Sequence, residues 1–183
     1  MDLDNTTNIT LRSSESIPNI RFGICLLFLD LGIILGNCVT ITVFRRNRTL
    51  RSPAGWIIVN IAACDLAIGV LVGVFVLPCV FSGYFPFHES IIQVEGALVL
   101  TFFDEAVYGL TLAAVDRYVA ICQPYHYVRL FSDTNLLGVF VLTWLYAALV
   151  PVVFTFTNGF KYYDLNLDAV CGVRATYTVW SSI

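Results

Sequence analysis

The residues that could do chemistry in this sequence are few, and most of them lie inside long apolar stretches. Asp116 and Arg117 are adjacent near the end of one such stretch, and Asp104 and Glu105 are adjacent near its middle. Adjacent carboxylates indicate an acid–base enzyme only weakly, because that chemistry needs two carboxyl groups flanking the reacting bond, usually from different elements. Successive residues of a helix point about 100° apart.

The elements that carry these residues are predicted to be transmembrane helices. The chain has 183 residues, of which 58% are hydrophobic and 13% are charged, so it is poorer in charge than a soluble domain. A membrane-spanning helix needs about 20 apolar residues, and the stretches 22–44, 56–81, 91–122 and 136–156 are long enough. They lack the strict alternation of membrane β-strands. The predicted fold is an all-α membrane helical bundle.

The loops predict how this bundle lies in the membrane. The link between the first two helices holds Arg45, Arg46, Arg48 and Arg51, whereas the next link has no lysine or arginine. Basic loops stay in the cytosol, so residues 1–21 form an extracellular tail of a plasma-membrane protein. Two glycosylation sequons, at Asn5 and Asn8, lie in that tail.

Residues 22–183 are predicted to form one membrane domain. After the fourth helix, residues 157–175 form an external loop, and residues 176–183 turn apolar, as at the start of a fifth helix. We expect a fragment or a truncated product.

Catalysis, cofactors and nucleic acid are not expected. We find no glycine-rich phosphate loop, no metal-ligand spacing and no serine–histidine pairing. The two histidines, His88 and His126, are predicted on opposite sides of the membrane. The net charge of −3 is too small to suggest nucleic-acid binding.

Polar residues at mid-membrane depth are costly and need an explanation. Asn37 and Asp65 fit two interpretations about equally well: a structural contact between helices or an ion or proton site. Asn60 and Trp144 can pair, amide with indole N–H, and here a structural role is favoured. Asp30 lies seven residues before Asn37, so both share one face of the first helix, which we expect to face protein.

The cysteines offer one covalent link. Of the six cysteines, most lie in the predicted spans, where they act as small apolar filler. Cys171, and Cys79 near the outer end of the second helix, are predicted on the oxidising side, and a bridge between them is one possibility.

Four landmarks occur in order along the chain: "GN" at 36–37, "NIAACDL" at 60–66, "DRYVAICQPYHY" at 116–127, and Trp144 in the fourth helix. Together they resemble the rhodopsin-like (class A) G-protein-coupled receptors over almost the whole chain. "DRYVAICQPYHY" is most similar to the odorant-type chemoreceptors. An amine ligand is not supported, because the position where amine receptors place an aspartate is Val99.

The resemblance implies a role for several residues. Arg117 would pair with Asp116 in the inactive state and turn to a heterotrimeric G protein on activation. The implied coupling residues are Asp116, Arg117, Tyr118, Pro124 and Tyr125. Asn37, Asp65, Asn60 and Trp144 would form a mid-membrane polar network, which binds sodium at the aspartate in many members. The implied pocket for an extracellular small molecule comprises Val99, Leu100, Phe103 and Asp104.

The sequence also departs from the family pattern. Ile92 replaces the usual cysteine at the start of the third helix, and Ala106 replaces a hydroxyl residue that often helps to hold sodium. The main hypothesis is that the chain is part of a receptor of this family and is in contact with membrane lipid. The alternative is a truncated isoform or four-helix scaffold that assembles with other receptor chains without signalling. An intramembrane enzyme or transporter is disfavoured.

Overall fold

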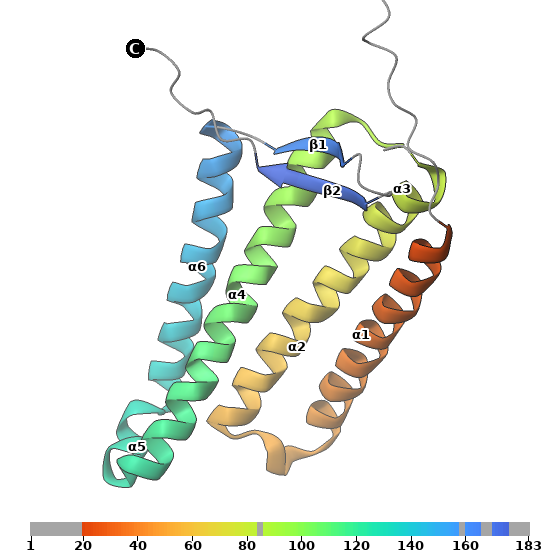
Figure 1. Ribbon diagram of the computed structural model, residues 1–183. Helices are drawn as coiled ribbons and strands as arrows, with labels where there is room; N and C mark the ends of the chain where they lie inside the picture. The colour runs from red at the N-terminus through yellow and green to blue at the C-terminus, as the bar shows by residue number, and fades with distance from the viewer. Residues whose placement is uncertain (1–19, 84–85, 158–159, 166–169, 176–183) are drawn as a thin grey trace, which may run out of the picture.

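The computed structural model describes residues 20–83, 86–157, 160–165 and 170–175. Within these ranges four long helical segments lie side by side (Figure 1), and all four are long and apolar enough to cross a membrane. The predicted all-α membrane bundle with four spanning helices is therefore confirmed. The N-terminal tail with Asn5 and Asn8, and the predicted start of a fifth helix, lie outside the described residues.

The helices extend a little beyond the predicted apolar stretches. The elements are α1 (Ile20–Arg46), η1 (Arg48–Leu50), α2 (Pro53–Leu71), η2 (Val72–Val76), α3 (Leu77–Ser82), α4 (Glu89–Cys122), α5 (Pro124–Leu130) and α6 (Asp133–Thr157). α2 and α6 begin at residues 53 and 133 rather than at 56 and 136. α2 begins earlier because Ser52 caps the helix: its hydroxyl oxygen accepts a 3.2 Å hydrogen bond from the Gly55 N–H, and Pro53 suits the first helical position.

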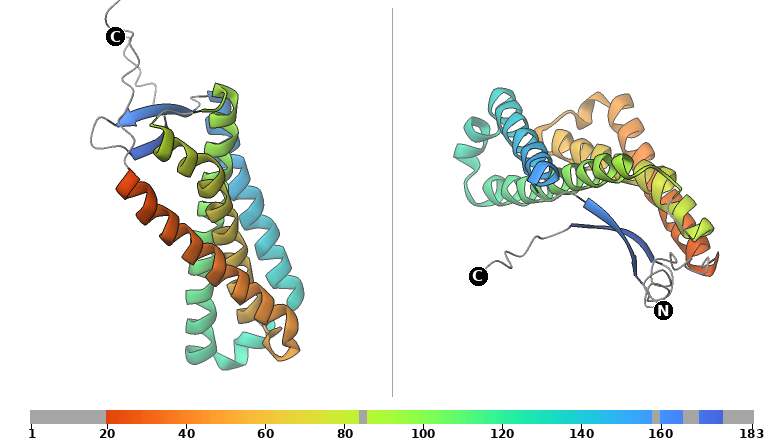
Figure 2. Two further views of the ribbon diagram at one scale, coloured as in Figure 1. Left: turned by 90° about the vertical axis from the view of Figure 1, so that its right-hand side faces the viewer. Right: turned by 90° about the horizontal axis from the view of Figure 1, so that it is seen from above.

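α4 is the central helix of the bundle. It packs against α2 on one side and α6 on the other, and α1 packs against α2, as the two views of Figure 2 also show. A Cβ added at Gly109 of α4 would lie 2.7 Å from Cγ1 of Ile61 on α2. This close approach therefore requires glycine. Small residues of this kind let helices pack tightly in lipid, where no hydrophobic force drives helices together.

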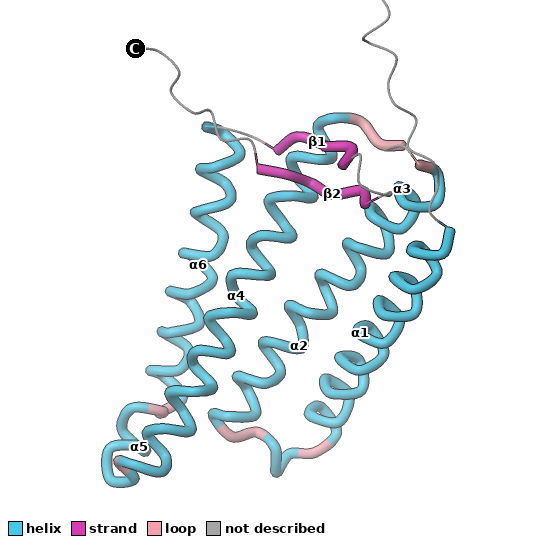
Figure 3. Tube along the Cα trace, viewed as in Figure 1, coloured by secondary structure: helices cyan, strands magenta, loops and turns pink. Residues whose placement is uncertain are grey.

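The second spanning helix changes its winding near one end. The five residues of η2 form a π-helix between α2 and α3, and Pro78 follows at the start of α3. The three elements form one continuous helical path (Figure 3), and Gly83 ends it with φ of 75°. Only glycine adopts that left-handed conformation without steric cost.

A β-hairpin lies beside α4, near the end of the bundle opposite α5 (Figure 1). Strands β1 (Phe160–Leu165) and β2 (Val170–Ala175) pair antiparallel, from Phe160 opposite Ala175 to Leu165 opposite Val170. β1 contacts α4 and β2 contacts α3, and the view from above in Figure 2 shows the hairpin alongside α4. The sequence predicted a loop over residues 157–175 but gave no sign of paired strands.

Candidate functional site

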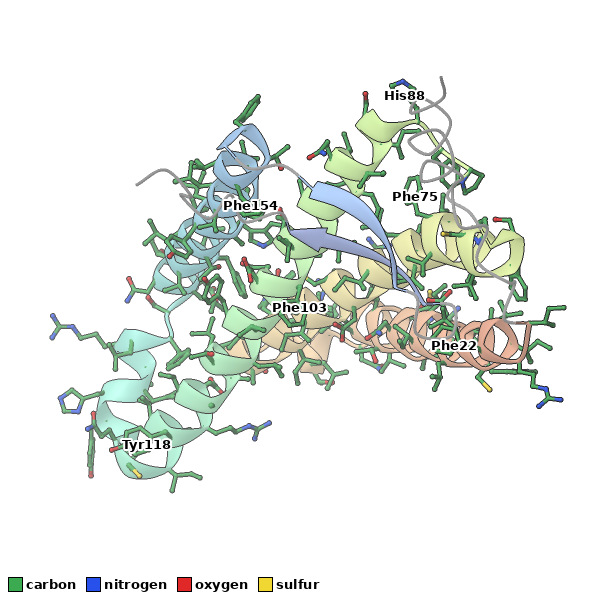
Figure 4. The ribbon with its side chains drawn as sticks, turned by 45° about the horizontal axis from the view of Figure 1, so that its top comes forward. Phe22, Phe75, His88, Phe103, Tyr118 and Phe154 are labelled. Atoms are coloured by element: carbon green, nitrogen blue, oxygen red, sulfur yellow. The ribbon has the colours of Figure 1, made fainter. Side chains whose placement is uncertain are left out.

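The first candidate site is the surface where α4 ends and α5 begins, which we call the α5 rim: Asp116, Arg117, Tyr118, Tyr125 and Tyr127. Asp116 is only 3% exposed, and its Oδ1 accepts a 2.8 Å hydrogen bond from the hydroxyl of Tyr127. Arg117 is exposed, Tyr118 is 60% exposed and Tyr125 is 95% exposed. Figure 4 shows Tyr118 at this end of the bundle, far from His88 at the other. The rim therefore has a cation and two phenol rings on its exposed surface.

The arrangement differs from the predicted ion pair between Asp116 and Arg117. Both residues lie in the described part of the chain, and they form no ion pair there; the partner of the carboxylate is Tyr127. The reason is helical geometry: adjacent side chains point about 100° apart, so Asp116 turns toward α5 while Arg117 stays exposed. Tyr127 was inside the quoted motif, but nothing in the sequence identified it as the partner.

Local sequence places α5 beside Asp116. The Gln123 N–H bonds to the Val119 carbonyl at 2.9 Å and ends α4, and Pro124 then begins α5, a position that suits proline because its missing N–H would be unpaired there anyway. The rings of Tyr127 and Phe131 stack with centroids 5.1 Å apart. Phe131 belongs to a buried apolar cluster with Ile57, Val119 and Leu136, so the inner face of α5 is fixed and its outer face is free.

The hydrogen bond to Asp116 also affects the acidity of Tyr127. Burial, and then the hydrogen bond and the negative charge of Asp116, raise the pKa of the phenol above its ordinary value, while Arg117 opposes the shift. Tyr127 therefore remains a neutral donor to Asp116 at physiological pH.

The second candidate site is a polar cluster inside the bundle, the Glu105 cluster: Asn60, Glu105, Thr143 and Trp144. Glu105 is 1% exposed, and its Oε1 accepts hydrogen bonds from Asn60 Nδ2 at 2.8 Å and Thr143 Oγ1 at 3.2 Å. Trp144 Nε1 donates to Asn60 Oδ1 at 3.1 Å, which is the pairing predicted for these two residues. The cluster joins α2, α4 and α6 around one carboxyl group.

Asn37 and Asp65 do not belong to this cluster. The amide of Asn37 donates to the carbonyl of Ile33 in its own helix at 2.9 Å, and the side chain of Asp65 forms no hydrogen bond with a described residue. Sodium binding at Asp65 stays a prediction of the family resemblance, and Ala106 has no side-chain oxygen to contribute to such a site. The predicted four-residue network is thus divided, with only Asn60 and Trp144 connected.

Sequence reasoning did not include Glu105 among the site residues. It placed Asp104 in the ligand pocket with Val99, Leu100 and Phe103; of these, Phe103 is 55% exposed and the other three are half-buried. The available signal was the adjacent pair of carboxylates, which indicated that at least one contacts a neighbouring helix. The structure assigns that role to Glu105.

Asp30 occupies a third buried position. It is 4% exposed, and Cβ atoms added at Gly69 and Gly73 would lie 3.4 and 3.2 Å from its two carboxyl oxygens. Its Oδ1 has no hydrogen-bond partner. The prediction that this face of α1 turns toward protein is confirmed, and two glycines one turn apart make the room for the carboxyl group.

Among the cysteines, Cys25, Cys38, Cys64 and Cys122 are free, and Cys79 in α3 is disulfide-bonded. The side chain of Cys171 lies outside the described residues, although its backbone is part of β2. The covalent link at this end thus uses α3, while Ile92, where the family usually has a cysteine, is buried in α4.

Comparison with known proteins agrees with this arrangement. The sequence model of the seven-transmembrane receptors of the rhodopsin family matches residues 36–183. The chain belongs to this family. Family membership and the apolar helices make it a multi-pass membrane protein, and the family comprises signalling receptors rather than enzymes.

Several curated relatives are similar over most of the chain. Rhodopsin of Sminthopsis crassicaudata is 29% identical over 77% of the chain and 41% of that protein. Octopamine receptor beta-1R of Drosophila melanogaster is 26% identical over 85% of the chain and 32% of that protein. Human adenosine receptor A2b is 30% identical over 62% of the chain and 34% of that protein. The chain spans about two fifths of the length of the first of these relatives.

Proposed function

We propose that this chain is part of a receptor that binds an extracellular small molecule and activates a heterotrimeric G protein at the α5 rim. The observation that carries the proposal is the rim itself. A buried Asp116 is held by Tyr127, while Arg117, Tyr118 and Tyr125 are exposed on adjoining helices. Arginine and tyrosine are among the residue types enriched where protein–protein binding energy is concentrated.

The proposal requires the rim to face the cytosol. The arginines at this end of the bundle support that orientation: Arg45, Arg46, Arg48, Arg51, Arg117 and Arg129 are all exposed. At the hairpin end, residues 83–88 between α3 and α4 contain no lysine or arginine. Basic residues in short loops favour the cytosolic side, so the N-terminal tail is extracellular in a plasma-membrane receptor.

The rim is a two-state element in this proposal. In the arrangement described above, the Tyr127 hydrogen bond holds Asp116 against α5. A ligand shifts a receptor toward its active state only by binding that state more tightly, and in that state Arg117 would contact the G protein. The ligand pocket would include Val99, Leu100, Phe103 and Asp104 on α4, toward the hairpin end.

The ligand class is a finer prediction. The odorant-type form of "DRYVAICQPYHY" supports an odorant-like molecule. Relatives named for octopamine and adenosine support a small-molecule ligand in general terms. Val99 supplies no carboxylate for an amine, so we expect a ligand that is neutral or that pairs with another group.

The test is nucleotide exchange by purified G proteins in the presence of the full-length receptor that contains this chain. We expect basal or ligand-stimulated exchange that Arg117→Ala reduces at least tenfold while ligand binding stays intact. Arg129→Ala is the matched control, because it also removes an exposed arginine, on α5, from outside the proposed rim. Exchange that is unchanged by Arg117→Ala, or that falls equally with Arg129→Ala, would contradict the proposal.

A further inference from the structure

A cavity lies between the first turns of α2 and α6, at the same end of the bundle as α5. Its volume is about 490 Å³. The residues that line it are Arg51, Trp56, Asp133, Leu136, Leu137 and Phe140. These are two opposite charges, an indole and three apolar side chains, a combination that neither the α5 rim nor the Glu105 cluster uses.

Helix packing accounts for the cavity. The hydrogen bond from Trp144 to Asn60 joins α2 to α6 inside the bundle. Trp56 and Phe140 each lie one helical turn before those residues, and there the two helices border the cavity instead. Leu136 is 5% exposed and belongs to the same buried cluster as Ile57, so one wall of the cavity is fixed by the core.

The two charged residues are available to a ligand. Arg51 closes η1 and Asp133 begins α6, and both are exposed. Neither side chain forms a hydrogen bond or an ion pair with a described residue. Both lie at the ends of spanning helices, together with Trp56, at the depth where indole rings favour the boundary between lipid and water.

We propose that this cavity binds one membrane phospholipid whose headgroup carries a phosphate and a primary ammonium, as in phosphatidylethanolamine. The Arg51 guanidinium would pair with the phosphate, for which its planar donors are well suited. The Asp133 carboxylate would accept N–H bonds from the ammonium, which has three hydrogens to donate. The part of an acyl chain nearest the headgroup would lie along Leu137 and Phe140.

The charge pair selects this headgroup over other lipids. A choline headgroup has the same charges but no N–H group, so it cannot donate to Asp133. A glycerol headgroup leaves Asp133 without a cation. A sterol uses neither charge. Charge-assisted hydrogen bonds are the stronger kind, so we expect about tenfold tighter binding of phosphatidylethanolamine than of phosphatidylcholine.

The experiment is native mass spectrometry of the purified chain with phosphatidylethanolamine, its mono-, di- and trimethylated forms, phosphatidylglycerol and cholesterol. We expect affinity to fall with each methylation, because each removes one N–H donor. Asp133→Asn should reduce phosphatidylethanolamine binding to the level of phosphatidylcholine, and Arg51→Gln should weaken both phosphatidylethanolamine and phosphatidylglycerol. Arg48→Gln is the matched control, because it removes an exposed arginine of η1 that does not line the cavity.

Several results would overturn the proposal. They are equal binding across the methylation series, displacement of phosphatidylethanolamine by cholesterol, or no retained lipid at all. Lipid selectivity that survives Asp133→Asn would equally reject the assigned contact. The methylation series uses the unaltered chain, so it decides the question even where a variant folds poorly.

Discussion

Replacing Asn60 by alanine tests whether the Glu105 cluster holds the bundle together. Asn60 makes two hydrogen bonds between helices, one to Glu105 at 2.8 Å and one from Trp144 at 3.1 Å. Such bonds average about 0.6 kcal/mol in membrane proteins and reach about 1.7 kcal/mol. Losing both, and leaving a buried carboxyl oxygen and an indole N–H without this partner, should lower the free energy of unfolding by about 1–3 kcal/mol.

The matched control is Asn37→Ala. Asn37 is also an asparagine in a spanning helix, but its amide bonds only to a carbonyl of its own helix. We expect a change within about 0.5 kcal/mol, because that carbonyl also belongs to the α1 backbone ladder.

The assay is reversible unfolding of the purified chain in mixed micelles of rising SDS content, followed by far-ultraviolet circular dichroism. Trp144→Phe removes only one of the two bonds, so its effect should lie between those of the two alanine variants. Equal midpoints for Asn60→Ala and Asn37→Ala would refute the idea that the cluster contributes to stability between helices.

Further predictions concern the helix contact at Gly109 and the α5 rim. Gly109→Ala should destabilise the bundle by about 1–3 kcal/mol in the same assay, because the new Cβ would lie 2.7 Å from Cγ1 of Ile61. Gly138→Ala is the control: a Cβ there would have no other atom within 4 Å, so the change should be neutral or stabilising. Equal effects of the two substitutions would contradict the role of Gly109. Tyr127→Phe leaves Asp116 Oδ1 without its donor and should cost about 1.5–3 kcal/mol, seen as faster hydrogen exchange in α5; unchanged exchange would refute the role. The pKa of Tyr127 is raised in the folded chain, so the neutral phenol contributes its full stability below the unfolded pKa of about 10. That contribution is lost as pH rises through the folded pKa. An ultraviolet difference titration against Tyr127→Phe should show this phenol ionising above pH 10, and ionisation at lower pH would contradict the prediction.

The helices were predictable because a bilayer imposes a length and a composition on any segment that crosses it. The buried position of Asp30 was also predictable, since a carboxyl group is costly in lipid and must turn toward protein. Asn60 and Trp144 could be paired from chemistry alone, as an amide and an indole with complementary groups.

The choice between Asp104 and Glu105 could not be made from the sequence. The two residues have the same chemistry and neighbouring positions, so the rotation of α4 about its axis decides which one faces α2 and α6. That rotation depends on long-range contacts such as Gly109 against Ile61. The partner of Asp116 was hidden for a similar reason, because it depends on how α5 folds back after Pro124.

The π-helix at Val72–Val76 has a consequence for comparing this chain with other receptors. A π-helix accommodates one extra residue in a helix without breaking it, so it turns the face of every later residue by about 100°. Positions counted from Asp65 by α-helical periodicity therefore cannot be extended to Leu77, Cys79 and Val80, which are the buried residues of α3. An alignment that allows a single-residue gap in this segment will match equivalent side chains, and one without the gap will exchange inward-facing and lipid-facing positions.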